Sequence, residues 1–340
     1  MSIRNFLKKH LPSYRTERRM MDELEKLRND MREMSKKNEM LFWNAQMQPG
    51  ETMRQTKERV YLNMPKATGR LRNIQLAENH ILQRVKQLCD DNEMHVFLVG
   101  GTLLGAVRHH GFIPWDNDID VGMMKADYLK LRKLLENDTE LRAEYCYNYA
   151  SGLRMSKIKY RGTDVFWIDI LVFDYIDVKP EDMPAVWLKT QQANREYGRK
   201  IQELAAEHLG KNYCRPVENH ALDAALQECE SALLAELPAF GHGDYFCEPI
   251  DCPYWSRDPR GIMKVDDFYP LCTEAVEFEG MKYDAWKNYL HALELAYGDI
   301  WSLPFSVSEP HTTEFDEGFS DGIAFLKEAG IIPAEEEVIL

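Results

Sequence analysis

Apolar residues upstream of the chain's midpoint recur first with the period of a helix and then with that of a strand. Between residues 70 and 92 they fall on one helical face, which predicts an amphipathic helix. An apolar run at 96–99 then stops at Gly100 and Gly101, as a buried strand does when it ends in a tight turn. Because glycine adopts positive φ without steric cost, the backbone here is able to approach a ligand closely.

The next strand-like segment carries acidic residues. Ile119 and Val121 alternate with Asp118 and Asp120, so both carboxylates point to one side of the predicted strand. Residues 125–137 follow with the apolar spacing of a second helix. The pattern therefore predicts alternating strands and helices around an acidic strand.

Three further strand-like runs follow at 145–149, 153–160 and 165–173. The last is nearly all apolar, which is typical of a strand buried on both faces, yet it contains Asp169. Burying an unpaired carboxylate costs several kcal/mol. We therefore expect a cationic group to meet Asp169.

Helical spacing dominates the second half of the chain. It occurs at 187–209, 222–233 and 284–297, whereas 246–267 is aromatic and loop-like. Together with the strands upstream, this predicts an α+β fold, in which helices flank a mixed sheet and the C-terminal half is largely helical.

The N-terminal region has a different pattern. Apolar residues recur there at alternating spacings of four and three, which is a heptad pattern: Met20, Leu24, Leu27, Met31 and Met34. Such a helix associates with itself or with a partner, and the alternative is a single helix packed on the main domain. Before it, residues 3–9 form a short basic amphipathic piece, which predicts contact with an anionic membrane surface or, alternatively, a solvated terminus.

Composition narrows the class of protein. With 340 residues, 44% hydrophobic and 29% charged, the chain is long enough for a large core. Its formal charge of −14 argues against nucleic acid as a general partner, because phosphate backbones are bound by excess Lys and Arg. Seven scattered cysteines and no long apolar run predict a cytoplasmic protein with reduced thiols, peripheral at most to the inner face of the membrane.

Asp118 and Asp120 suggest metal chemistry. Two neighbouring carboxylates repel each other, and a divalent cation allows both to stay ionised. Mg²⁺, or Mn²⁺ in its place, suits carboxylate and phosphate oxygens and implies a phosphate-bearing substrate. The alternative for a D-x-D run alone is a solvated acidic turn.

The neighbours of this D-x-D run favour a binding site. Gly100, Gly101 and Thr102 open an apolar segment whose first amide groups have no helical partner, and unpaired amides of this kind bind phosphate. Arg108 begins a basic cluster with His109 and His110. A phosphate site between these groups and the acidic strand is therefore predicted.

The run from Gly100 to Asp120 resembles the signature of the LicD family, the phosphocholine transferase group that includes the fukutin-related phosphoribitol transferases. The likeness spans about residues 70 to 311. It implies a nucleotidyltransferase-type fold and metal-dependent transfer of a substituted phosphate from a CDP-activated donor to a sugar hydroxyl of a cell-surface glycan. The segment between the glycines and the acidic strand is longer than in the general nucleotidyltransferase pattern, as it is in the LicD group.

The resemblance also assigns residues. It implies that Asp169 is the third acid, which joins Asp118 and Asp120 as catalytic residues around the metal. Lys157 and Thr163 match the family's K-I-x-x-x-x-T segment. Together with Arg108, Lys157 would then neutralise charge on the transferred phosphate.

A choline-bearing donor would need an aromatic cage for its quaternary ammonium group. The aromatic residues available for it are Trp115, Tyr160, Trp167 and Trp255. The sequence names neither the transferred group nor the acceptor glycan.

The chain divides into four predicted parts, namely an N-terminal helical extension at 1–45, a linker at 46–69, a nucleotidyltransferase-like catalytic core at 70–180 and a mostly helical part at 181–340 that completes the site. Two other functions share these features. One is a nucleotide-sugar glycosyltransferase that uses D-x-D to hold its metal. The other is a non-catalytic scaffold with a vestigial acidic site.

Overall fold

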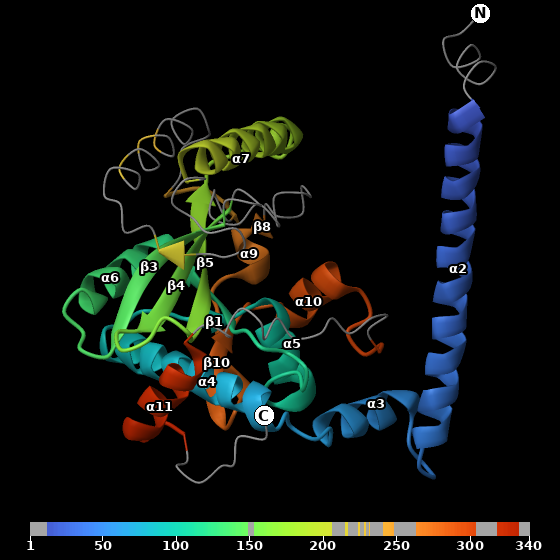
Figure 1. Cartoon of the computed structure of the whole chain (residues 1–340), viewed down its shortest axis with the longest axis horizontal. Helices are drawn as coiled ribbons and strands as arrows, with labels where there is room; N and C mark the ends of the chain where they lie inside the picture. The colour runs from blue at the N-terminus through green and yellow to red at the C-terminus, as the bar shows by residue number, and fades with distance from the viewer. Residues whose placement is uncertain are drawn as a thin grey trace, which may run out of the picture. The chain divides into compact units, whose positions relative to one another are not determined.

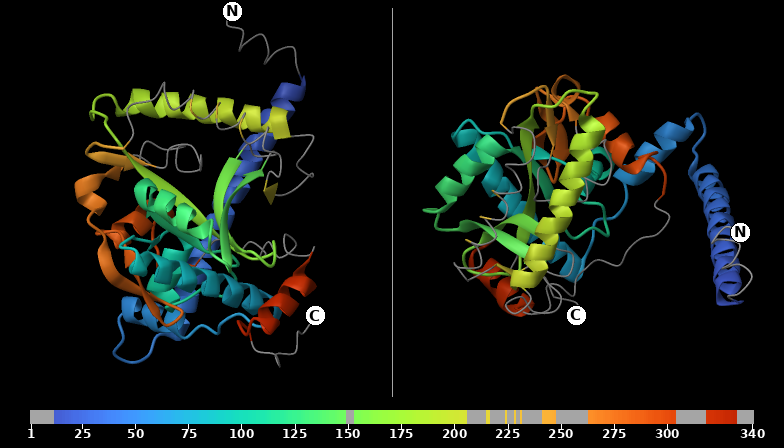
Figure 2. Two further views of the ribbon diagram at one scale, coloured as in Figure 1. Left: turned by 90° about the vertical axis from the view of Figure 1, so that its left-hand side faces the viewer. Right: turned by 90° about the horizontal axis from the view of Figure 1, so that it is seen from above.

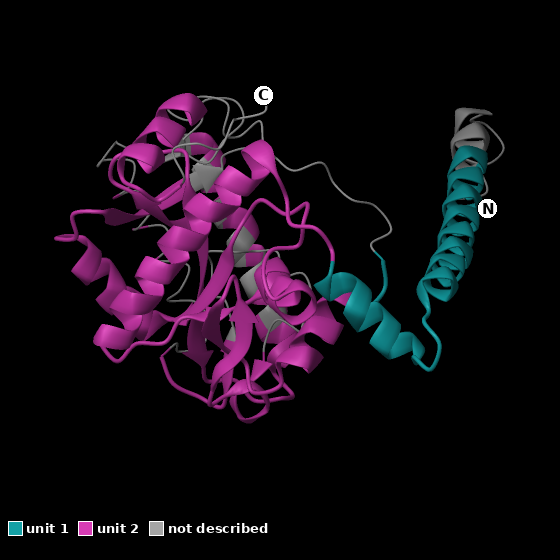
Figure 3. Ribbon diagram, turned by 90° about the horizontal axis from the view of Figure 1, so that it is seen from below, with its two compact units in different colours: residues 1–63, 301–308 teal, residues 64–300, 309–340 magenta. Residues whose placement is uncertain are grey.

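The computed structural model describes residues 12–148, 153–205, 215–216, 224, 228, 231, 241–247, 263–303 and 318–332. The chain forms two compact units (Figure 3). Unit 1 comprises Met1–Asn63 and Trp301–Ser308, and unit 2 comprises Met64–Ile300 and Glu309–Leu340. The predicted basic segment at 3–9, most of the stripe at 222–233 and most of the loop at 246–267 lie outside the described residues.

The described part of unit 1 contains the helices α2 (Pro12–Gln46) and α3 (Met53–Leu62). Thr52 caps α3 in a reciprocal capping box with Gln55, because each side chain accepts the other residue's backbone N–H. The C-terminal end of α2 packs on α3 through Trp43, whose ring lies 5.6 Å from that of Tyr61. The Tyr61 hydroxyl donates to the Ser302 carbonyl at 2.8 Å and so ties residues 301–303 to this unit.

Unit 2 holds the sheet and the remaining helices. Its helices are α4 (Gly69–Asp91), α5 (Gly100–His109), α6 (Lys125–Leu135), α7 (Met183–Ala205), α9 (Val265–Phe268), α10 (Tyr289–Tyr297) and α11 (Phe319–Glu328). Its strands are β1 (Phe97–Leu98), β2 (Asp120–Met124), β3 (Leu141–Asn148), β4 (Leu153–Tyr160), β5 (Trp167–Ile176), β6 (Arg215–Pro216), β7 (Tyr245–Cys247), β8 (Met263–Lys264), β9 (Cys272–Phe278) and β10 (Met281–Ala285).

The described strands form a mixed sheet in the order β6-β3-β4-β5-β2-β1-β10-β9 (Figure 1). Strands β2 and β5 run parallel, as do β1 and β10, while the other neighbours along this path are antiparallel. Off this path, β7 pairs with β5 and with β8. The parallel pair β2 and β5 places two acidic strands side by side, which is the feature that builds the site.

Helices cover the sheet. Helix α4 packs against β4 and β5, and α6 packs against β2, β3 and β5. Helix α7 lies across one end of the strands (Figure 2). The predicted α+β class, a mixed sheet flanked by helices, is confirmed.

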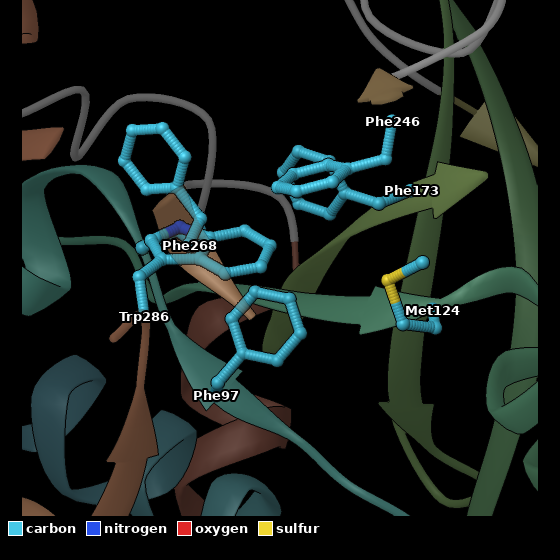
Figure 4. Close-up of a cluster of buried hydrophobic side chains, with 7 residues drawn as sticks. Phe97, Met124, Phe173, Phe246, Phe268 and Trp286 are labelled. Carbon is cyan, nitrogen blue, oxygen red and sulfur yellow. The ribbon is translucent and has the colours of Figure 1, made fainter. Parts of the chain in front are cut away.

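An aromatic cluster lies on the sheet beyond the acidic residues. It consists of Phe97, Val99, Met124, Phe173, Phe246, Phe268 and Trp286, and all are buried (Figure 4). Because Phe173 follows Asp169 by four residues on β5, both side chains lie on the same face of the sheet. The cluster therefore anchors the strands on the face that carries the acids.

The predicted helices at 70–92 and 125–137 are confirmed as α4 and α6. The helix predicted at 284–297 is wrong at its start, because β10 continues to Ala285 and α10 begins at Tyr289. Strand β10 forms a hairpin with β9 and pairs with β1, so this part of the chain extends the sheet.

Candidate functional site

Two of the predicted acids are register partners. Asp120 begins β2 and lies opposite Asp169 on the parallel strand β5. The backbone N–H of Asp120 donates to the Thr102 hydroxyl oxygen at 2.8 Å, which fixes the start of β2 against α5. The sheet therefore brings together two carboxylates that are far apart in the chain.

The double glycine lies directly against the acidic residues. A Cβ atom placed on Gly100 would be 3.1 Å from Asp120 Oδ2, and one on Gly101 would be 3.1 Å from Asp116 Oδ2. Gly100 also adopts a φ of +54°, which disfavours other residues. Glycine therefore suits both positions, because a side chain at either one would crowd a carboxylate of the cluster.

The cation expected beside Asp169 is Lys157. Its Nζ lies 2.8 Å from Asp169 Oδ1 and 3.0 Å from Oδ2, and the two residues face each other across β4 and β5. Only 3% of the Lys157 side chain is exposed, and its Nζ also lies 4.4 Å from the centre of the Trp167 ring. The lysine is thus held at the acidic cluster by both an ion pair and an aromatic face.

The acids raise one another's pKa values. Burial and then the charge of Asp118 raise the pKa of Asp116 to about 8. Burial, followed by the charges of Asp118, Asp169 and Asp116, places the pKa of Asp120 well above its ordinary range. Burial also raises the pKa of Asp169, although Lys157 opposes this. The acids therefore carry more negative charge than Lys157 neutralises, and a bound cation would supply the positive charge that is still needed.

A fifth carboxyl group lies against this cluster. Glu78 on α4 is fully buried, and neither of its carboxyl oxygens has a hydrogen-bond partner among the described residues. Burial, followed by the charges of Asp118 and Asp169, raises the pKa of Glu78 well above its usual value. Orphaned carboxyl oxygens beside other acids are unusual in a folded protein and indicate a ligand that is not a side chain.

The other predicted site residues have diverse surroundings. Asp118 is exposed just before β2, and Trp115 is half-buried. Thr102 is buried, with its hydroxyl oxygen accepting from Asp120 as described above. Arg108 is buried on α5 and donates to the Ile300 carbonyl at 3.1 Å. Burial, followed by the charges of Asp120, Asp116 and Asp118, raises the pKa of Tyr297, and the charge of Arg108 opposes this rise.

The donor set suits a hard divalent cation, since every acidic side chain offers oxygen. Within the described residues, no three His, Cys, Asp or Glu side chains already have the spacing of a coordination shell. Mg²⁺ prefers such oxygen ligands and completes its coordination shell with water and substrate phosphates. The orphaned oxygens of Glu78 and the raised pKa values of the acids support the same fit.

Sequence reasoning missed Asp116 and Glu78. Asp116 extends the period-two pattern of Asp118 and Asp120 by one step, so the signal was present in the run. Glu78 lies four residues after Ile74 and three before Ile81, on the apolar stripe of the helix. The signal for Glu78 in the sequence is therefore a charged residue on an otherwise apolar stripe of the helix.

None of the described helices combines the length with the apolar composition that crossing a bilayer demands.

Comparison with known proteins agrees with this geometry. Residues 93–205 match the family model "LicD/FKTN/FKRP, nucleotidyltransferase domain". The chain is 26% identical over 256 residues to "Lipopolysaccharide cholinephosphotransferase LicD" of Haemophilus influenzae, which covers 69% of this chain and 92% of that protein. It is also 36% identical over 73 residues to an uncharacterized protein of Rickettsia prowazekii, across 22% of this chain and 27% of the relative. The resemblance to the LicD family seen in the sequence is therefore confirmed, with its family-model match confined to the nucleotidyltransferase domain at residues 93–205.

Proposed function

We propose that this protein is a metal-dependent transferase that moves a substituted phosphate of the phosphocholine type from a CDP-activated donor to a sugar hydroxyl of a cell-surface glycan. The observation that carries the proposal is the pairing of Asp120 with Asp169 on adjacent parallel strands beside the start of α5. Similarity to a lipopolysaccharide cholinephosphotransferase over most of that protein's length supports the transferred group.

The start of α5 binds the donor's phosphates. Backbone amides in the first turn of a helix lack helical partners and carry the positive end of the helix dipole. At Gly100 and Gly101 no side chain covers them, so a phosphate is able to approach. Arg108 on the same helix and Lys157 on β4 add positive charge.

Asp118, Asp120 and Asp169 would hold Mg²⁺, or Mn²⁺ in its place. The bound ion would neutralise the donor's diphosphate and stabilise CMP as it leaves. Asp118 is exposed, whereas Asp120 and Asp169 are half-buried. Lys157 keeps Asp169 in place by holding both of its oxygens.

A carboxylate of this cluster accepts the proton of the attacking sugar hydroxyl. Asp116 suits that role, because its pKa of about 8 lies near neutral pH, where a general base is most effective. Its position against Gly101 keeps it beside the phosphate-binding turn.

Trp115 is the aromatic residue best placed to meet a quaternary ammonium group. Tyr160 is fully buried and donates its hydroxyl to the Ala77 carbonyl, and Trp167 already has Lys157 over its ring. Trp255 lies outside the described residues. Trp115, half-buried and adjacent to Asp116, therefore remains.

The test is the identity of the released nucleotide. The protein is incubated with Mg²⁺ and either CDP-choline or a UDP-sugar, with a polysaccharide acceptor or with water alone. We expect CMP from CDP-choline, faster with the acceptor, and no UDP.

Release of UDP would instead show a nucleotide-sugar glycosyltransferase. Absence of both products, together with no heat of binding for Mg²⁺ or CDP-choline in calorimetry, would contradict the proposal and favour a non-catalytic scaffold.

A further inference from the structure

The long helix α2 presents an apolar stripe that none of the described residues of unit 1 covers. Its apolar heptad residues are between 47% and 64% exposed, namely Met20, Leu24, Leu27, Met31, Met34 and Leu41. Burying such side chains is favourable, and contiguous exposed apolar surface marks an interaction site. This stripe therefore needs a partner.

The stripe continues the heptad farther than the five residues noted from the sequence. Met20, Leu27, Met34 and Leu41 occupy d positions, and Leu24 and Met31 occupy a positions. The next a position is Asn38, which is also exposed. The seam thus runs from Met20 to Leu41, about three heptads, which is the length from which coiled coils become recognisable.

Helix α2 uses a different face for packing within unit 1. Glu39 and Trp43 lie at b and f positions and face α3, where Lys57 Nζ is 3.8 Å from Glu39 Oε1 and 5.4 Å from the centre of the Trp43 ring. The neighbouring seam residues Asn38 and Leu41 stay exposed. Contact with α3 therefore leaves the seam available.

Charges beside the seam are complementary to a second copy of the same helix. In a parallel pair, a g residue faces the e residue five positions later on the partner helix. Glu23 is at g and Arg28 is at e, so each helix offers a charge of opposite sign to its copy, twice in the pair. The next g to e′ pairs are Asp30 with Ser35 and Lys37 with Phe42, and neither brings like charges together.

Asn38 specifies the arrangement. In a parallel, in-register pair, each Asn38 meets the other, so their amides are able to hydrogen-bond across the seam. An antiparallel pair would place this polar side chain against an apolar one, at the cost of an unpaired buried amide. A single a-position Asn is typical of two-stranded coiled coils with one fixed register.

We propose that α2 forms a parallel two-stranded coiled coil with α2 of a second copy of this chain, through the seam Met20 to Leu41. The protein is then a homodimer with two catalytic units. This inference is independent of the reaction, because no residue of the acidic cluster takes part.

The test is the molar mass of the full chain in solution, measured by light scattering during size-exclusion chromatography and by sedimentation equilibrium. We expect a dimer for the native sequence. The double variant Leu24→Glu/Leu27→Glu places charge in adjacent layers of the seam and should weaken the dimer at least about 100-fold. Because both residues are exposed within one chain, the variant should keep its fold and its thermal transition.

A matched pair of single variants distinguishes the effect of charge placed on the seam from the effect of charge placed elsewhere on the surface of α2. Met34 lies at d and is 60% exposed, whereas Met40 lies at c, off the seam, and is 56% exposed. Met34→Glu should shift the equilibrium toward monomer, and Met40→Glu should leave it unchanged.

Two further outcomes address register. Leu27→Cys should give a disulfide-linked dimer on mild oxidation, and Met40→Cys should not. Asn38→Leu should tighten association and admit species larger than a dimer. A native chain that stays monomeric at about 100 μM, or a dimer that survives Leu24→Glu/Leu27→Glu, would overturn the proposal.

Discussion

The acidic cluster of unit 2 and helix α2 of unit 1 depart from the usual burial pattern in opposite directions. In unit 2, charged side chains of Glu78, Asp120, Asp169 and Lys157 lie in the folded body, where apolar residues are normally found. In unit 1, leucine and methionine side chains face solvent along one helix. Each region is incomplete by itself, but the missing component differs.

The carboxyl groups carry more negative charge than Lys157 neutralises, and the exposed seam of α2 needs apolar contact. Burial raises the pKa values of Asp116, Asp120 and Glu78, so these groups destabilise the fold when ionised. The exposed seam of α2 has no such electrostatic cost and merely forgoes hydrophobic free energy. The grouping of acids that the proposed reaction needs therefore lowers stability, whereas the proposed dimerisation through the seam raises it.

The largest effect is expected from removing a proposed metal ligand. Asp120→Asn should lower CMP release from CDP-choline at least about 100-fold, because it removes a charge that stabilises the transition state. The matched control is Asp174→Asn, on the same strand as Asp169. It breaks the ion pair of the buried Asp174 carboxylate with the partly exposed Lys125 at 3.0 Å and lies outside the cluster. The control should lose stability but keep its rate. Equal losses of rate in both variants would remove the distinction between the two acids.

Substitution of Lys157 tests whether the positive charge beside Asp169 contributes to the rate of transfer. Lys157→Met should slow CMP release about 10-fold or more, since a phosphate-neutralising charge is lost. Lys159→Met is the matched control, because Lys159 is equally buried on the same strand but pairs with Glu144 at 2.7 Å and acts on Asp169 less strongly than Lys157 does. Both variants leave a half-buried partner acid and should lose about 3 kcal/mol of unfolding free energy. If Lys159→Met slowed transfer as much as Lys157→Met, the assigned role of Lys157 would be wrong.

The pH dependence of stability tests whether the cluster opposes folding. The pKa of Asp116 is raised from 3.8 to about 8, so its contribution to stability is complete below about pH 4 and is lost as the pH rises toward 8. Without divalent cation, the native chain should therefore unfold at a lower temperature at pH 8 than at pH 5. Asp116→Asn should reduce this decline by a few degrees.

Asp91→Asn, at an exposed site, serves as the control for the pH experiment and should follow the native curve. Added Mg²⁺ should raise the transition temperature most at high pH, where the carboxyl groups are ionised. Superimposable curves for Asp116→Asn and the native chain would contradict the assignment.

Substitution of Glu78 is expected to give the smallest effect. It contrasts most clearly with α2, because the side chain removed is buried and polar, whereas those of the α2 seam are exposed and apolar. Glu78→Met removes two buried oxygens without hydrogen-bond partners and should raise the free energy of unfolding by about 1 kcal/mol, measured by urea denaturation without metal. Glu78→Gln keeps polar atoms at the same place and should gain little. A large loss of stability in Glu78→Met would mean that the carboxyl group stabilises the fold.

Local patterns were sufficient to predict part of this site. The turn at Gly100, the acids at 118 and 120 and the lone acid at 169 are each visible in a short run. Their convergence depends on the parallel pairing of β2 with β5, which no short run reveals. Glu78 joins them from a helix about 40 residues upstream of the acidic strand, so only the fold shows which group its stripe faces.

The hairpin of β9 and β10 shows where periodicity misled. Residues Trp286, Leu290, Leu293 and Tyr297 have helical spacing, and we extended that helix back to 284. Tyr283 and Ala285 are buried at a period of two, and Glu279 and Gly280 both adopt positive φ, as in a two-residue hairpin turn. Pairing with the very short β1 therefore overrode the helical signal next to it.

The central claim is that these acids bind a divalent cation together with the donor's diphosphate. Its most direct test is titration of Mn²⁺ into the protein with and without CDP-choline, following free Mn²⁺ by electron paramagnetic resonance. The account predicts a single bound Mn²⁺ per chain that CDP-choline tightens, in the native protein and in Asp174→Asn, and its loss in Asp120→Asn. Undiminished binding by a folded Asp120→Asn variant, or no binding by the native chain with CDP-choline present, would contradict it.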